Sequence, residues 1–318
     1  MRVLVTGASG FVGSAVLKRL VSDGHEAMAS VRRAPEEPVA GVSYVAGADL
    51  VSGTGWEAAV RGADAVIHAA ARVHVMEERA ADPLAEFRRA NVDGTLRLAE
   101  AAAAAGVRRF VFLSSIKVNG ETTQAGRPFR ADDPPQPLDP YGVSKLEAEE
   151  ALFALSQRTG MGVAVVRPPL VYGPGVKANF RAMMGLLQRR LPLPLGAARA
   201  KRSLVALENL VDLLMRCLDH PEAAGRVFLV SDGEDLSVAE MLKRLGAALG
   251  RRPLLLPVPP AAIALAARLA GRGAVAQRLL MPLQVDIEPT RRLLGWSPPV
   301  PVDEAFARTA RHFLEARR

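Results

Sequence analysis

A tyrosine and a lysine four residues apart, Tyr141 and Lys145, carry the most specific chemistry in this sequence. On a helix this spacing places both side chains on one face, one turn apart. A free phenol loses its proton only near pH ~10, and a nearby ammonium is expected to lower the pKa of Tyr141 towards neutrality. A hydroxyl of the upstream pair Ser114-Ser115 could then hold the oxygen of an alcohol or ketone beside the phenol. These residues predict proton transfer at a carbon that also exchanges a hydride.

The flanking sequence indicates where the elements that carry these residues begin and end. Asp139-Pro140 is a helix-start signal directly ahead of Tyr141. Ser114-Ser115 follow the apolar run 110–113, which is typical of a buried strand. The carboxyl end of a strand is where doubly wound sheets bind ligands. Catalysis is therefore favoured over a chance pairing of tyrosine and lysine, provided that the chain also has a dinucleotide site.

A glycine-rich turn near the amino terminus has the context of such a site. An apolar strand at 3–5 leads into three glycines with the spacing G-x-x-G-x-x-G, and a helical pattern follows. Glycines let the backbone approach a pyrophosphate, and the helix N-terminus attracts its negative charge. The spacing differs from G-x-G-x-x-G, but the strand–turn–helix context favours dinucleotide binding. The predicted cofactor contacts in this turn are Gly7, Ser9, Gly10, Phe11, Val12 and Gly13.

The residues after the second strand, at 27–31, indicate which dinucleotide is used. An acid at this point hydrogen-bonds the ribose of NAD, whereas an arginine accommodates the 2′-phosphate of NADP. The sequence has Arg32 and Arg33 and no acid. We therefore expect NADP(H), with NAD(H) as the possible alternative, and Arg32 as the main phosphate ligand. The alternative is that both arginines are ordinary solvated residues at the start of a loop and bind no cofactor.

Strand and helix patterns alternate up to about residue 175, which predicts an α/β fold with a Rossmann-type doubly wound parallel sheet. After Gly175 the alternation ends, and we expect a smaller mixed α/β lobe that binds substrate. The predicted domains are 1–175 for the dinucleotide, with contributions from about 203–231, and 176–318 for the substrate, partly interwoven. Within the lobe, the apolar segment 191–196 precedes three cations at 199–202 and could hold a base and a diphosphate. A turn with solvated charges is the alternative.

Composition excludes several other classes. The chain has 318 residues, of which 49% are hydrophobic, and fits a soluble globular protein. A net charge of +8 raises the question of nucleic acid, but the arginines are scattered and aromatics make up only 5%. An anionic small substrate explains the charge equally well, and we expect no nucleic-acid partner. The five histidines lack the spacing of metal ligands, so no metal is expected.

The single cysteine and the absence of a long apolar stretch bear on location. Cys217 rules out an internal disulfide and lies in an apolar helical pattern, so we expect it in the core of a cytoplasmic protein. No signal peptide is recognisable. The most apolar helical stretch, 261–270, is too short to span a bilayer and contains Arg268.

Together these residues resemble the extended short-chain dehydrogenase/reductase family, and within it the NAD-dependent epimerase/dehydratase group. The resemblance covers nearly the whole chain and rests on motifs that occur in the family's order. They are Thr6-Gly7-x-x-Gly10-x-x-Gly13, His68-Ala69-Ala70, Asn91-Val92-x-Gly94-Thr95, Ser114-Ser115, Tyr141-x-x-x-Lys145, Arg167-Pro168 with Val171-Tyr172-Gly173-Pro174, and Gly295-Trp296-x-Pro298.

The resemblance implies roles for individual residues. Ser115, Tyr141 and Lys145 would be catalytic, with Tyr141 moving the proton and Lys145 holding the nicotinamide ribose. Asp49 matches a residue that meets the adenine. Members of the family commonly form homodimers through two long helices, here 85–105 and 140–160. Further cofactor contacts implied by the resemblance are Leu50, Ala69, Ala70, Ala71, Asn91 and Pro168.

Among subgroups, the chain is similar to enzymes of bacterial polysaccharide pathways that act at C4 of UDP-sugars and are related to UDP-glucose 4-epimerase. This implies an NAD(P)-dependent 4-ketoreductase of a UDP-4-keto-6-deoxy-hexosamine. The alternatives are a UDP-hexose or UDP-N-acetylhexosamine 4-epimerase and a non-catalytic dinucleotide-sensing protein. Asn179, Leu193 and Arg202 fall where the family grips uracil and diphosphate.

One motif departs from the family pattern. The tyrosine expected in Val-Tyr-Gly after the serine pair is Asn119. Lys117 and Asn119 could face the sugar and alter its choice, or they could belong to a loop with an exposed lysine.

Overall fold

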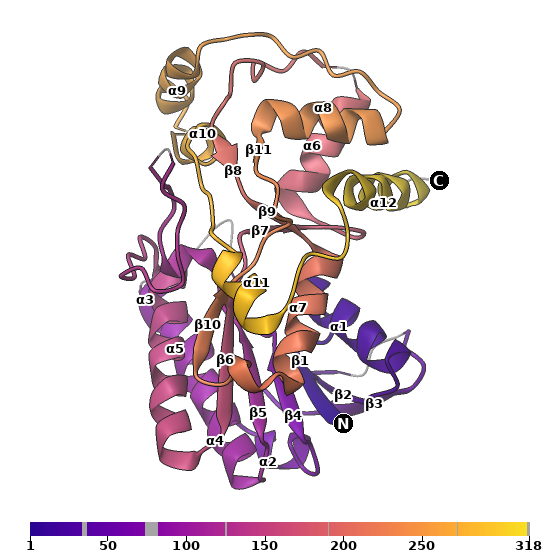
Figure 1. Cartoon of the computed structure of the whole chain (residues 1–318), viewed down its shortest axis with the longest axis vertical. Helices are drawn as coiled ribbons and strands as arrows, with labels where there is room; N and C mark the ends of the chain where they lie inside the picture. The colour runs from indigo at the N-terminus through magenta and orange to yellow at the C-terminus, as the bar shows by residue number, and fades with distance from the viewer. Residues whose placement is uncertain (34–36, 74–81, 125, 190, 272, 317–318) are drawn as a thin grey trace.

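The computed structural model describes residues 1–33, 37–73, 82–124, 126–189, 191–271 and 273–316. Its larger body is built on a seven-stranded parallel sheet (Figure 1). The strand order is β10-β6-β5-β4-β1-β2-β3. The chain therefore adds β2 and β3 on one side of β1, and then β4 and the later strands on its other side. The strands are β1 (Arg2–Thr6), β2 (Glu26–Val31), β3 (Val42–Ala46), β4 (Ala65–His68), β5 (Arg109–Leu113), β6 (Gly162–Arg167) and β10 (Arg226–Leu229). This sheet confirms the predicted Rossmann-type α/β class.

Both faces of the sheet are covered by helices, as the continuous apolar strand patterns require. Side chains alternate along each strand, so Val3 and Val5 of β1 enter one core and Leu4 enters the other. The first core is completed by α1 (Phe11–Ser22) and α7 (Leu207–Asp219). The second is completed by α2 (Trp56–Ala59), α4 (Gly94–Ala104) and α5 (Pro140–Thr159).

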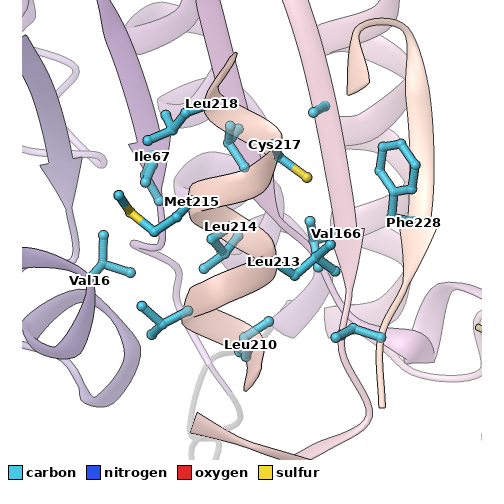
Figure 2. Close-up of a cluster of buried hydrophobic side chains, with 14 of the residues drawn as sticks. Val16, Ile67, Val166, Leu210, Leu213, Leu214, Met215, Cys217, Leu218 and Phe228 are labelled. Carbon is cyan, nitrogen blue, oxygen red and sulfur yellow. The ribbon is translucent and has the colours of Figure 1, made fainter. Parts of the chain in front are cut away.

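Cys217 lies on the buried face of α7, among leucines and the side chains of Val166 and Phe228 (Figure 2). Burial raises the pKa of its thiol to about 12. The predicted core role of Cys217 is therefore confirmed.

The helix that carries Tyr141 begins and ends as the sequence predicts. The side chain of Asp139 caps α5 by accepting a hydrogen bond from the backbone N–H of Gly142 at 2.7 Å. Pro140 occupies the first turn, and Gly160 ends the helix in the left-handed conformation at φ 75°.

The long helix expected at 85–105 is instead three consecutive pieces. These are α3 (Pro83–Arg88), a π-helical turn η1 (Arg89–Asp93), and α4. The π turn contains Asn91, whose side chain binds backbone outside the helix. Single π-helical turns of this kind occur frequently at functional sites.

The remaining elements form a smaller lobe beyond the carboxyl ends of the sheet strands (Figure 1). Its core gathers Tyr172, Phe180 and Phe306, whose rings lie within 6.2 Å of one another. Two short sheets stiffen it: β7 (Leu170–Tyr172) with β9 (Leu204–Ala206), and β8 (Lys201–Arg202) with β11 (Leu236–Ser237). Its helices are α6 (Ala178–Gln188), α8 (Val238–Ala248), α9 (Pro260–Leu269), α10 (Gly273–Leu280) and α12 (Val302–Glu315). Shorter pieces elsewhere are η2 (Ile116–Val118), η3 (Pro221–Ala223) and α11 (Glu288–Leu294).

Among the described residues, no helix combines the length and apolar character that crossing a bilayer requires.

Candidate active site

A cavity of about 790 Å³ runs along the carboxyl ends of β1, β4 and β5, at the point where the strand order reverses. This is the position at which doubly wound sheets bind ligands, and the volume suits a ligand of cofactor size. Its lining includes most of the predicted cofactor residues and two of the three predicted catalytic ones. They are Gly7, Ser9, Gly10, Phe11, Val12, Gly13, Arg32, Asp49, Leu50, Ala69, Ala70, Ala71, Ser115, Tyr141 and Pro168.

The glycine turn has no room for side chains. Gly7 adopts φ 67°, and a Cβ there would lie 2.7 Å from the backbone carbon of Ala69. A Cβ on Gly13 would lie 2.2 Å from the carbonyl oxygen of Gly7. Gly10 caps α1 without a side-chain hydrogen bond. The turn therefore presents bare backbone and a helix N-terminus to the cavity, which fits the pyrophosphate of a dinucleotide.

Two arginines lie where this cavity meets an adjoining one. Arg32 lines it and also lines an adjoining cavity of about 580 Å³, together with Arg33 and Ser9. Both arginine side chains are exposed. Asp49 lies between the two cavities and accepts hydrogen bonds from the N–H groups of Val51 and Ser52 at 2.9 and 2.8 Å. The hydrogen bond from Ser52, helped by the charge of Arg32, lowers the pKa of Asp49, so this site holds one fixed anion beside two cations.

The half-buried side chain of Tyr141 lines the cavity. Burial, with a further contribution from the carboxylate of Asp139, raises the pKa of Tyr141 to about 12. The expectation that Lys145 would lower this pKa is wrong for the structure. The reason is geometric, because the Lys145 ammonium lies over the Phe112 ring, 3.8 Å from its centre. Burial lowers the pKa of Lys145 to about 7, against the opposing charge of Glu149.

The structure separates the roles of the two serines. The Ser114 hydroxyl is buried and donates a short hydrogen bond to Glu149. Ser115 is only half-buried, and its Oγ accepts a hydrogen bond from the backbone N–H of Lys117 at 3.3 Å. Because the proton of Ser114 is already engaged, Ser115 is the serine that suits a substrate oxygen.

A buried charged network lies directly behind the serines. The guanidinium of Arg167 donates to both carboxylate oxygens of Glu149, at 3.0 Å from Nε and 2.5 Å from Nη2. Its Nη1 donates to Asn119 at 2.9 Å, and the Asn119 amide donates to the carbonyl of Arg130 at 2.8 Å. Sequence analysis missed this network, although Glu149 follows Lys145 by one helical turn and could have indicated it.

Asn119 and Lys117 are not among the described residues that line the cavity. Asn119 is buried and held by Arg167. The Lys117 ammonium pairs with Asp139 and, at 3.2 Å, with Glu121. Both side chains therefore have partners within the protein. The predicted contact of Lys117 and Asn119 with a sugar stays a prediction.

Asn91 acts one layer behind the cavity. Its amide donates to the carbonyl of Arg72 and to Ser144 Oγ, both at 3.0 Å, and its oxygen accepts from the Arg72 N–H at 2.7 Å. Asn91 therefore ties the segment 69–73, which lines the cavity, to helix α5.

The three residues predicted to grip a nucleotide are not gathered at the described lining of this cavity. Leu193 is buried in the lobe core and pairs through its backbone with Leu254 and Leu256. The Arg202 guanidinium donates to the carbonyl of Met281 at 2.6 Å. Asn179 lies in the first turn of α6, and its side chain falls outside the described residues.

Sequence analysis also missed several lining residues. Trp56, Glu86 and Arg89 come from helices on the second face of the sheet and carry no local motif. Thr6 is the last residue of β1 and Ser30 the last but one of β2, and their position near strand ends is the signal that could have found them.

A glycine turn and a Ser115–Tyr141 pair that open onto one cavity of a doubly wound sheet define the class of dinucleotide-dependent short-chain enzymes. The sequence model of the NAD dependent epimerase/dehydratase family matches residues 3–231, and the chain belongs to this family. It is accordingly an enzyme of the epimerase and reductase type.

Three similar proteins illustrate the range of the family. The chain is 45% identical over 315 residues to a UDP-glucose 4-epimerase of Vibrio cholerae, covering 99% of this chain and 96% of that protein. It is 33% identical over 193 residues to a GDP-6-deoxy-D-mannose reductase of Pseudomonas aeruginosa, covering 57% of this chain and 62% of that protein. The solved structure of MoeE5 in complex with UDP-glucuronic acid and NAD is 27% identical, with a TM-score of 0.79 over 99% of this chain and 100% of that one.

Proposed function

We propose that this enzyme acts at C4 of a UDP-sugar and reduces a 4-keto group with NADPH, with a UDP-4-keto-6-deoxy-hexosamine as the substrate. The observation that carries the proposal is a single cavity with Ser115 and Tyr141 at one end and Arg32 at the other. The similarity to MoeE5, which was solved with a UDP-sugar, supports the substrate class.

The protonated form of Tyr141 suits the proton-donating step of a ketone reduction. A pKa of about 12 keeps the phenol protonated at neutral pH, and the protonated phenol is the form that donates a proton to a ketone oxygen. Ser115 would hold that oxygen by a hydrogen bond, which fixes the carbonyl beside the phenol. A bound nicotinamide cofactor supplies the hydride. Its pyrophosphate would be held by the turn at Gly7 to Gly13, and its 2′-phosphate by Arg32 and Arg33.

The test mixes enzyme, NADPH and a UDP-4-keto-6-deoxy-hexosamine and follows the absorbance of reduced nicotinamide. We expect catalytic loss of this absorbance and a product that is two hydrogens heavier by mass spectrometry. No consumption of NADPH or of NADH with this substrate would sink the proposal.

A second candidate is 4-epimerisation of a UDP-hexose or UDP-N-acetylhexosamine. The observation that favours it is the 45% identity with a UDP-glucose 4-epimerase along almost the whole chain. The same serine and tyrosine would serve it, but the cofactor would be regenerated in every turnover. Interconversion of UDP-GlcNAc and UDP-GalNAc without added reductant would place epimerisation first.

We also propose that residues 1–175, with 203–231, bind the dinucleotide and that 176–318 bind the sugar nucleotide. A homodimer through the two helical stretches 85–105 and 140–160 is part of the same proposal. Light scattering coupled to size exclusion tests the dimer, and a monomeric mass would refute it.

A further inference from the structure

One end of the smaller lobe exposes an unusual amount of apolar surface. We define the lobe tip as helix α9 with the two paired segments 191–196 and 253–259, which lie together at the end remote from the sheet (Figure 1). Helix α9 has no buried residue. Leu265 and Leu269, one turn apart on the same side, are 61% and 82% exposed. A helix of ordinary globular proteins buries such a stripe.

The paired segments continue the same surface. Leu193 and Leu255 form a parallel bridge, and Leu255 packs against the lobe core. Side chains alternate along an extended segment, so its neighbours Leu254 and Leu256 point outward, where they are 54% and 41% exposed. Leu191 adds a further exposed side chain of 44%. The apolar surface of α9 therefore extends along the chain that leads into it.

The charge of this region has one sign. The sequence contains no aspartate or glutamate between Glu240 and Asp286, and none between Glu150 and Glu208. These two stretches together contribute the whole lobe tip. Exposed arginines accompany the apolar residues, namely Arg189, Arg199, Arg251, Arg252 and Arg268. Arg268 lies within α9 next to Leu269, so its aliphatic stem can cover apolar surface while its guanidinium reaches a charged headgroup.

We propose that the lobe tip binds the surface of an anionic lipid bilayer, with α9 lying in the plane of the interface. An anionic bilayer attracts a surface that has exposed leucines and arginines and no carboxylates. The leucines enter the boundary of the acyl chains, and the arginines pair with the anionic headgroups. Helix α9 has ten residues, about 15 Å in length, and the hydrocarbon core is about 30 Å thick, so α9 rests on the bilayer and does not span it.

Charge complementarity selects the bilayer over a second copy of this chain. Two lobe tips facing each other would bring arginines together with no carboxylate of the tip to pair with them. A lipid surface offers negative charge throughout and needs no shape complementarity. With the tip on the bilayer, the sheet lies on the far side of the smaller lobe from the membrane (Figure 1).

The test measures binding of the full chain to vesicles and does not depend on catalytic activity. We expect co-sedimentation with vesicles of phosphatidylcholine containing phosphatidylglycerol, and little with phosphatidylcholine alone. Raising the salt to about 0.5 M should weaken binding, because the Debye length shortens. Binding that is no stronger on the anionic vesicles than on the neutral ones would overturn the proposal.

Substitutions locate the surface. Leu265→Ser with Leu269→Ser is expected to reduce the partition coefficient by about tenfold or more, because two apolar side chains no longer enter the interface. Arg268→Glu should reduce it as well on anionic vesicles. The matched controls are Arg311→Glu, an equal charge change at an exposed position of α12, and Leu138→Ser, which removes a side chain 70% exposed outside the lobe tip.

Three outcomes would refute the assignment to the lobe tip. An equal loss of binding in Arg311→Glu would mean that net charge alone drives binding, and an equal loss in Leu138→Ser would mean that exposed apolar side chains outside the lobe tip serve as well. A lower molecular mass of the α9 double variant, without vesicle binding by the parent protein, would mean that α9 joins two copies of the chain. Because α9 has no buried residue, its variants are expected to keep the melting temperature and cofactor affinity of the parent.

Discussion

The Lys145 ammonium lies 3.8 Å from the centre of the Phe112 ring, on the side of α5 that faces the sheet. The i, i+4 spacing from Tyr141 is present, but the lysine is buried beneath the tyrosine and directed at an aromatic face. In this state the phenol keeps its proton, since burial raises its pKa to about 12. A protonated phenol is prepared to donate, which links this arrangement to reduction of a ketone.

Removing the hydroxyl of Tyr141 should slow turnover strongly and leave cofactor binding intact. Tyr141→Phe is expected to lower kcat by roughly 10²–10⁴-fold, the usual contribution of a positioned acid. The affinity for NADPH, measured by fluorescence titration, should change little because the ring remains. Unchanged turnover would remove Tyr141 from its assigned role.

Arg32 should determine the preference of the enzyme for NADPH over NADH. Arg32→Ala is expected to raise the KM for NADPH about tenfold or more, the value of a charged hydrogen bond, and to leave the KM for NADH nearly constant. Steady-state kinetics with both cofactors check this. Equal effects on both would mean that Arg32 does not bind a 2′-phosphate.

The glycine turn can be probed with a paired substitution. Gly13→Ala places a methyl group 2.2 Å from the Gly7 carbonyl oxygen, so the turn must shift. We expect a lower melting temperature and loss of cofactor binding. Gly185→Ala in helix α6 is the control, because a Cβ there meets nothing within 4 Å. The control should stabilise the protein by about 0.5–1 kcal/mol.

The ion pair behind the serines should be costly to break from one side. Glu149→Gln leaves the buried Arg167 guanidinium without its anion, and we expect a loss of about 3–5 kcal/mol in the free energy of unfolding. Glu149→Met combined with Arg167→Met should cost less than Glu149→Gln alone. Denaturant unfolding of the parent, the single variant and the double variant tests this. A double variant with a lower free energy of unfolding than the single variant would contradict it.

Acid stability should depend on His68. This ring is fully buried between Thr6 and Thr95, at 2.6 and 2.9 Å, and burial lowers its pKa to about 3. The unfolded chain binds a proton near pH ~6.5 that the folded chain does not, so stability falls as the pH drops from there to about 3, by up to about 1.4 kcal/mol per pH unit.

His68→Gln can still bond both threonines and does not titrate. Its unfolding free energy should therefore depend less on pH in this window, as measured by urea unfolding at a series of pH values. Parallel pH profiles for the two proteins would exclude His68 as the source.

The sequence by itself determined the sheet, the glycine turn and the helix of Tyr141. These depend on local signals, namely continuous apolar strands, three regularly spaced glycines between a strand and a helix, and the Asp139-Pro140 helix start. Each is set by residues close in the chain, so pattern and spacing are sufficient to predict them.

Only the tertiary structure decided where the buried charges are paired. Glu149, Arg167 and Asn119 are far apart in sequence and meet because β5, β6 and α5 converge behind the serines. The same packing directs Lys145 at Phe112 and reverses the expected shift in the pKa of Tyr141. The pKa of a side chain depends on its burial and on its distance from other charges. Both are set by the assembled fold, so the spacing of residues in the sequence does not determine them.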